Sequence, residues 1–167
     1  MKNILSILLV SIILMGCSEN RVLLEELTNK GSKEDPLMYY EGDLYDGVGF
    51  DVYPDGQLRG EGNYKDGQED GLHKWWHKNG QLEWERNFKD GKLDGVWKEW
   101  YENGQLMSEG NYKDGKQDGL WKDWYENGQL KEEGNYKDGK KDGLWRWWSE
   151  DGQLKWEQNW KDGKRID

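Results

Sequence analysis

The stretch YKDGKQDGLWKDWYENGQLKEEG, residues 112–134, decides the fold because nearly the same string recurs along the chain. The pair Asn127-Gly128 has counterparts at a 24-residue step, at positions 55, 79, 103 and 151. The pair Asp114-Gly115 repeats with the same step, at positions 66, 90, 138 and 162. Since such pairs tolerate the positive φ angles of type I′ turns, each unit predicts a two-residue β-hairpin.

Charged residues provide a first test of this register, because residues equidistant from a hairpin turn face one another. Around Asn127-Gly128, Lys122 faces Glu133. The equivalent pairs are also of opposite charge: Lys74 with Glu85, Lys98 with Glu109, and Arg146 with Glu157. The sequence therefore predicts the same strand pairing in every hairpin.

The neighbouring position carries tryptophan on both strands or on neither. Trp75 faces Trp84 and Trp147 faces Trp156, whereas Glu99 faces Ser108 in a middle repeat. This co-variation supports the register. Because Glu99 and Ser108 serve at the same position, the fold does not require the four tryptophans there; they are either cross-strand clamps that stiffen the hairpins or a candidate binding surface. The last pair, Asp123 with Glu132, is like-charged and unfavourable, so we expect both side chains to be splayed into solvent.

Composition explains how so polar a chain folds. Charged residues make up 35% of the sequence and the mean hydropathy is -1.21, but there are 12 tryptophans and nine tyrosines. Each buried aromatic side chain removes about 150–250 Å² from water. We therefore predict an all-β fold over residues 37–167, an elongated antiparallel β-meander of about five repeats, held together by aromatic ladders across successive strands.

The N-terminus has the features of a lipoprotein signal peptide. Residues 1–16 contain one lysine and an apolar run, Ile4 to Met15, that is shorter than the ~20 residues of a transmembrane helix. The sequence LMGC, ending at Cys17, resembles the bacterial lipobox, in which the cysteine carries diacylglycerol and a further acyl chain such as palmitate. The alternative is a plain secretory signal with an incidental cysteine. Ser18, in place of aspartate, favours the outer membrane over the inner.

Residues 17–36 are polar and free of aromatic side chains, and we interpret them mainly as a lipidated tether. The formal charge of the chain is -10. That charge disfavours nucleic acid as a partner and favours basic proteins or peptides.

The repeat consensus resembles the bacterial variant of the MORN repeat, including proteins of the YwqK family that carry an antitoxin label. The resemblance rests on the turn pairs, the Leu-Trp start and the Gln-Leu second strand, and covers residues 37–164. It implies extended antiparallel sheets that serve as scaffolds or binding platforms. Departures lie where Gly49 and His73 replace a tryptophan, and where Arg86 and Gln158 replace a glycine.

Catalytic, cofactor and metal sites are not expected. His73 and His77 occupy repeat positions filled elsewhere by Trp or Tyr, and about 13 Å separates them along a strand. They are interpreted as substituted ladder residues. The DGKQDG loops resemble a calcium loop only vaguely, because the spacing differs and the bidentate glutamate is missing.

The leading functional hypothesis is therefore a non-enzymatic, lipid-anchored envelope protein that binds a protein partner through its repeat sheet. One alternative is an antitoxin or immunity protein that neutralises a basic toxin. Another is a surface lipoprotein that binds glycans, since sugars stack on exposed indoles.

Overall fold

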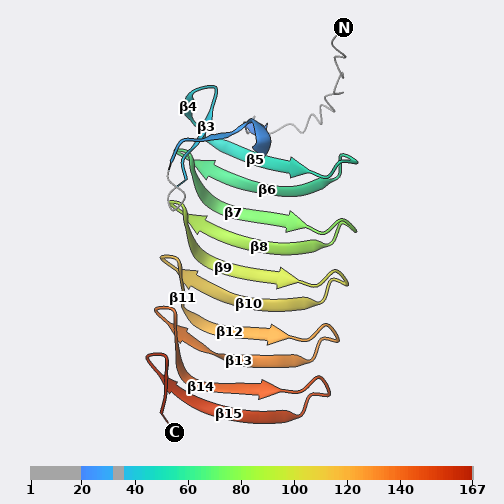
Figure 1. Cartoon of the computed structure of the whole chain (residues 1–167), viewed down its shortest axis with the longest axis vertical. Helices are drawn as coiled ribbons and strands as arrows, with labels where there is room; N and C mark the ends of the chain where they lie inside the picture. Colours follow the sequence, from blue (N-terminus) through green and yellow to red (C-terminus); the bar gives the residue numbers. More distant parts are fainter. Residues whose placement is uncertain (1–19, 32–35, 167) are drawn as a thin grey trace.

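The computed structural model describes residues 20–31 and 36–166, and it is almost entirely β-structure (Figure 1). Within these ranges no helix is long and apolar enough to cross a membrane. The strands are β1 (Arg21–Leu23), β2 (Thr28–Asn29), β3 (Met38–Tyr40), β4 (Asp43–Leu44), β5 (Gly47–Val52), β6 (Leu58–Lys65), β7 (Gln68–Trp76), β8 (Leu82–Lys89), β9 (Lys92–Trp100), β10 (Leu106–Lys113), β11 (Lys116–Gln117), β12 (Gly119–Trp124), β13 (Leu130–Lys137), β14 (Lys140–Trp148), β15 (Leu154–Lys161) and β16 (Lys164–Arg165).

One sheet of 13 strands runs the length of the molecule in the order β1-β5-β6-β7-β8-β9-β10-β12-β13-β14-β15-β16, with β11 beside β10. From β5 onward neighbouring strands are antiparallel, and Figure 1 shows them stacked along the long axis as an elongated, curved slab. The predicted all-β meander is confirmed. The predicted repeat region begins at residue 37, but its first strands, β3 and β4, do not add to this sheet, because they pair with β2 in a separate three-stranded sheet.

The two kinds of turn pair have different structures. At Asp138-Gly139 both residues have positive φ, 49° and 78°, and Lys137 pairs with Lys140, so the turn is of type I′ as predicted. Each such turn also rests on the turn of the preceding hairpin: the amide of Gly139 donates to the carbonyl oxygen of Gln117 over 2.9 Å. These contacts stack the turns along one edge of the slab.

The predicted two-residue turn at Asn127-Gly128 is wrong. Of these two residues only Gly128 has a positive φ, 83°, and the amide of Tyr125 donates to Gln129 across a three-residue loop. A type I turn followed by a left-handed glycine gives this geometry. A bulge at Lys131 then shifts the pairing by one residue.

The longer loop and the bulge move the pairing by one residue in opposite directions. Beyond the bulge the predicted register is therefore confirmed. All four opposite-charge pairs occur: Lys74 with Glu85, Lys98 with Glu109, Lys122 with Glu133, and Arg146 with Glu157. Both predicted tryptophan pairs and the pairing of Glu99 with Ser108 also occur.

An aromatic ladder takes the place of an aliphatic core. Ring contacts connect Trp97 to Trp121 over 4.9 Å, and Tyr136 to Trp145 over 4.9 Å. Trp145 is completely buried. Glycines make this packing possible: a Cβ on Gly134 would lie 2.1 Å from the Trp145 ring, too close for any side chain. In β15 the corresponding glycine is replaced by Gln158. Within the described chain no further strand brings a ladder tryptophan against this position, so a side chain can be accommodated there.

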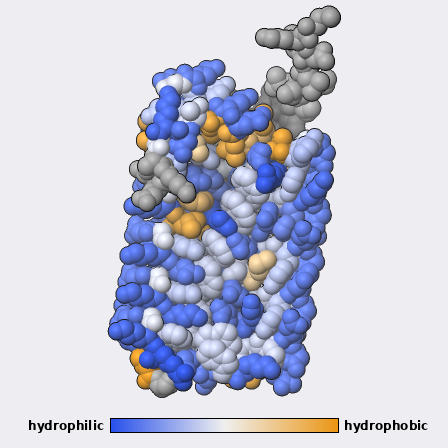
Figure 2. All heavy atoms as spheres, in the orientation of Figure 1, coloured by the Kyte–Doolittle hydropathy of each residue, from blue (hydrophilic) through white to orange (hydrophobic). Residues whose placement is uncertain are grey.

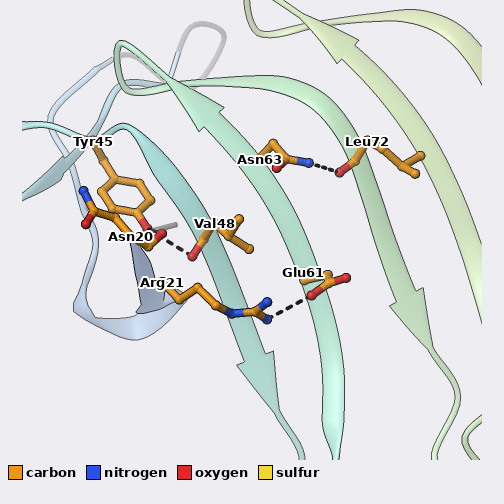
Figure 3. Close-up of polar contacts among 7 residues, drawn as sticks. All are labelled: Asn20, Arg21, Tyr45, Val48, Glu61, Asn63 and Leu72. Atoms are coloured by element: carbon orange, nitrogen blue, oxygen red, sulfur yellow. Dashed lines mark hydrogen bonds and ion pairs between the residues drawn. The ribbon is translucent and has the colours of Figure 1, made fainter. Parts of the chain in front are cut away.

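The N-terminal segment is a capping structure where we expected mainly a tether. Residues Arg21–Leu23 form β1, which pairs in parallel with the edge strand β5, and Val22 is buried. Figure 3 shows two polar contacts that hold it: the Tyr45 hydroxyl donates to the carbonyl oxygen of Asn20 (2.9 Å), and Arg21 pairs with Glu61 (2.9 Å). A free edge strand is prone to unwanted pairing, and β1 covers this one.

Hydrophilic residues dominate the face shown in Figure 2, and the strongly hydrophobic residues gather mostly at the end near β5. The surface between the ends is a mixture of charged side chains and aromatic rings of intermediate hydropathy. Such a surface offers side chains rather than an enclosed cavity for binding.

Candidate functional site

The four tryptophans that the sequence singled out lie in one row across the sheet. We call this the acid–aromatic row; it consists of Trp75, Trp84, Glu99, Ser108, Asp123, Glu132, Trp147 and Trp156. Strand alternation puts the row on the same face as the buried ladder. The contact between Trp145 and Trp147, with ring centroids 5.8 Å apart, confirms this placement.

Each tryptophan pair is a stacked cross-strand pair. The ring centroids of Trp75 and Trp84 are 5.1 Å apart with the planes inclined by 9°; those of Trp147 and Trp156 are 3.6 Å apart and inclined by 18°. Arg86 lies over Trp84 at 4.3 Å, so its guanidinium covers part of that pair. Trp156 is 48% exposed. The two pairs therefore differ, and the second presents the more open indole.

The middle of the row is acidic, and its carboxylates are held in place. The guanidinium of Arg86 donates to Glu99 over 2.6 Å. The indole N–H of Trp121 donates to Asp123 over 3.1 Å, and the hydroxyl of Ser108 donates to the same carboxylate. The indole N–H of Trp147 donates to Glu132.

The expectation that Asp123 and Glu132 are splayed into solvent is therefore wrong. Both residues are only partly exposed. Their repulsion is offset by donors on neighbouring strands, Ser108 and Trp147, and by Trp121 on the same strand as Asp123. A hydrogen bond to a carboxylate is stronger than one between neutral groups. The pair stays on the face as a fixed patch of negative charge.

A lysine of the chain shows what this patch attracts. The ammonium of Lys141 lies 3.6 Å from the ring centre of Trp145 and 4.9 Å from that of Trp147. Burial lowers the pKa of Lys141, and the negative charges of Glu132 and Asp123 oppose that effect. Burial likewise raises the pKa of Glu132, and Lys141 opposes that shift. The face therefore already holds one cation over its indole rings, within the electrostatic influence of two carboxylates.

Both histidines are ladder residues, as predicted. Nε2 of His73 donates to the carbonyl oxygen of Asn63 over 2.8 Å, as the indole N–H of Trp145 does to Asn135 over 3.1 Å. Nε2 of His77 donates to the Trp100 carbonyl oxygen over 3.0 Å, a role that tyrosine hydroxyls have in other repeats. Burial lowers the pKa of His73, which favours its neutral, donating form.

The aspartates of the DGKQDG-type loops stabilise turns. Asp94 accepts from the amide of Asp114 over 3.2 Å, and Asp142 accepts from Lys161. Across residues 20–31 and 36–166, no group of three or more His, Cys, Asp or Glu side chains is arranged to hold a metal ion. The predicted lipidation residue, Cys17, lies outside the described residues.

Sequence reasoning missed Lys141 and Arg86 as members of this face. The position of Lys141 is occupied by Glu69, Leu93 and Gln117 in other repeats, so no pattern distinguished it. Arg86 was visible as a departure from glycine, and the structure supplies its role: its guanidinium lies 5.5 Å from the Trp97 ring centre and pairs with Glu99.

The MORN repeat variant family model matches the chain five times, at residues 45–66, 69–90, 93–114, 117–138 and 141–162. The chain belongs to the MORN repeat variant family. The five matches coincide with the five hairpin units of the long sheet, so this MORN repeat protein has the architecture of a repeat-based binding module.

No curated protein matches this MORN repeat chain. Solved structures with local similarity include S. aureus TarM in complex with fondaparinux, α-GlcNAc-glycerol and UDP, at 10% identity and a TM-score of 0.35, covering 71% of this chain and 21% of that one. A second is the GtfA/B complex bound to UDP and GlcNAc, at 14% identity and a TM-score of 0.25, covering 77% and 23%. The chain spans less than a quarter of either solved chain.

Proposed function

We propose that this MORN repeat protein is a non-enzymatic, lipid-anchored protein of the bacterial envelope that binds a protein partner through the acid–aromatic row. One observation carries the proposal: the stacked Trp147 and Trp156 occupy a position where the repeat tolerates Glu99 and Ser108, and Trp156 is 48% exposed. Rigid, half-exposed aromatic side chains are the residues most enriched at the centres of interfaces. The fold alone does not require them there.

The charge of the row indicates the kind of partner. The carboxylates of Glu99, Asp123 and Glu132 lie between the two tryptophan pairs, and the whole chain carries a formal charge of -10. Lys141 supplies an internal example of an ammonium on this face: it lies over the Trp145 ring and is influenced by the charges of Glu132 and Asp123. A partner whose surface carries basic side chains, together with groups that stack on indole rings, is the best complement to this face.

The same carboxylates favour a second candidate function, an antitoxin or immunity protein that neutralises a basic toxin. Co-expression with the product of a neighbouring toxin-like gene tests this function, because an antitoxin must restore the growth of cells that produce the toxin. Glycan binding is the third candidate, since the open face of Trp156 suits a sugar ring; binding on a glycan array with no protein capture favours it.

The membrane anchor is a separate part of the proposal. Cys17 precedes Asn20 by three residues, and the carbonyl oxygen of Asn20 already accepts from Val48 over 2.7 Å. Three extended residues span at most about 10 Å, so a lipidated Cys17 keeps the β5 end of the sheet close to the membrane. Cys17→Ser should abolish labelling by a fatty-acid analogue; equal labelling of the variant contradicts the anchor.

Exchanging Trp147→Glu together with Trp156→Ser tests the binding face. A purely structural role as a cross-strand clamp predicts a lower melting temperature with unchanged partner capture from envelope extracts. The proposed role predicts lost capture with a melting temperature close to that of the wild type. Leu120→Ser is the matched control, because Leu120 is 48% exposed on the opposite face and its loss should leave capture intact.

A further inference from the structure

The opposite face of the sheet carries a row of alternating charge. We call it the charge row; it consists of Glu61, Lys74, Glu85, Lys98, Glu109, Lys122, Glu133, Arg146 and Glu157. Each inner glutamate has a basic residue opposite it on both neighbouring strands. Cross-strand pairs of opposite charge stabilise a sheet, so this row specifies which residue each new strand must bring.

The two ends of the charge row differ. At the first end, Glu61 faces Lys74 on one side and Phe50 of β5 on the other. Arg21 of the capping strand β1 reaches Glu61 from beyond β5, over 2.9 Å (Figure 3). At the last end, Glu157 pairs with Arg146 over 3.4 Å from β14. Within the described chain no strand brings a second basic residue to Glu157.

The outer edge of β15 is correspondingly open. The short strand β16 pairs only with Trp160 and Lys161, so Leu154–Glu157 has a neighbouring strand on the β14 side alone within the described ranges. Leu154 and Trp156 are also among the most exposed large apolar residues there. An edge with free backbone donors and acceptors is a template for a further strand.

We infer that this edge is a docking site for an extended basic segment of another protein, which adds one antiparallel strand beside Leu154–Glu157. The inference rests on the proposed protein-binding function and names the partner's chemistry. The added segment puts Arg or Lys opposite Glu157 and an aromatic side chain against the open face of Trp156, as Arg146 and Trp147 do from the other side. Addition of a strand to a sheet edge is an established mode of peptide recognition.

Net charge selects a foreign segment over a second copy of the chain. Two copies each carry a formal charge of -10, which opposes their approach, whereas a basic segment is attracted. The capped end shows that a short strand is enough: β1 has three residues, and its arginine reaches the first glutamate of the row.

A synthetic peptide tests the inference directly. The probe has the sequence of residues 140–149, KKDGLWRWWS, and the matched control carries glutamate in place of its arginine. With the mature chain carrying Cys17→Ser, we expect binding of the probe and slower hydrogen exchange at the amides of Leu154–Glu157. The control peptide should bind at least about fivefold more weakly, given the size of cross-strand charge effects.

Reversing the protein's charge completes the test. Glu157→Lys should invert the preference, so that the control peptide binds more tightly than the probe. Equal affinities in both proteins, or protection that leaves the Leu154–Glu157 amides unchanged, overturns the inference. A dimer with protected Leu154–Glu157 amides in sedimentation and exchange experiments without peptide also overturns it, because the occupant is then a second copy.

Comparing Glu157→Lys with the double variant Trp147→Glu and Trp156→Ser separates this inference from the proposed function. If Trp147→Glu with Trp156→Ser abolishes partner capture while Glu157→Lys leaves both capture and peptide preference unchanged, the binding face stands and the edge site fails. If no partner is captured at all but the peptide preference inverts, the edge site stands and the acid–aromatic row fails as the partner surface.

Discussion

Gly134→Ala should destabilise the protein through a single contact. Its Cβ would lie 2.1 Å from Cδ2 of Trp145, whose side chain is completely buried. Neither the strand backbone nor a buried indole moves easily, and overpacking of this kind costs about 1–3 kcal/mol, occasionally more. The φ of Gly134 is not in the left-handed region, so the cost comes from the contact and not from backbone strain.

A double-mutant cycle isolates that contact. Trp145→Ala alone should cost about 3–5 kcal/mol. In that background, Gly134→Ala should no longer destabilise and should gain about 0.5–1 kcal/mol, because alanine is preferred to glycine within a regular element. The coupling free energy should therefore be about 1.5–4 kcal/mol, at or above the upper part of the range of about 0.5–3 kcal/mol seen for residues in direct contact.

Urea unfolding followed by far-ultraviolet circular dichroism measures the four free energies of unfolding. Gly119→Ala is a useful control: Gly119 has a φ of 91° and an open surrounding, so its substitution should cost backbone strain in both backgrounds equally. If Gly134→Ala destabilises equally with and without the Trp145 indole, the glycine does not serve to seat that ring, and the account of the ladder is wrong.

Three further changes test other parts of the fold. Burial lowers the pKa of His73, so as pH falls the imidazole is protonated in the unfolded chain before it is protonated in the folded one. The free energy of unfolding should therefore decrease as pH drops below about 6.5. His73→Trp should reduce that decrease, and an unchanged pH profile refutes the assignment. Tyr125→Phe removes a 2.9 Å hydrogen bond to the next repeat and should cost about 1 kcal/mol in urea unfolding, whereas no change means that water replaces the bond. In the Cys17→Ser background, cysteines at Asp123 and Glu132 should form a disulfide far more readily than cysteines at Asp123 and Glu133; equal yields contradict the register.

The register was predictable because the repeats supply several copies of the same facing positions, whose residues can be compared. Tryptophan occurs at both members of a facing pair or at neither, as in Trp75 with Trp84 and Trp147 with Trp156, and this co-variation does not depend on the turn type. The turn itself was not predictable from Asn127-Gly128, because that pair suits both a type I′ turn and a type I turn with a left-handed glycine. Compensation by the bulge at Lys131 has no signature in the repeat consensus.

The errors at the N-terminus and in the acidic pair have a common physical reason. Val22 is buried by strand β5, and Asp123 is held by donors on Ser108 and Trp121. Strand β5 is distant in sequence from Val22, and Ser108 lies on β10, so neither partner is indicated by the local sequence; only Trp121 is local, two residues before Asp123 on β12. Local polarity therefore predicted a tether and a solvated pair where the assembled sheet provides partners for both.

Hydroxyl-radical footprinting of the protein with its captured partner tests whether the acid–aromatic row is the binding surface, because it reports the solvent exposure of individual side chains. Partner binding should reduce oxidation of Trp156, which is 48% exposed in the free chain, and leave oxidation of Leu120 on the opposite face unchanged. Unchanged oxidation of Trp156, with protection confined to Leu120 and its neighbours, contradicts the assignment of the acid–aromatic row as the binding surface.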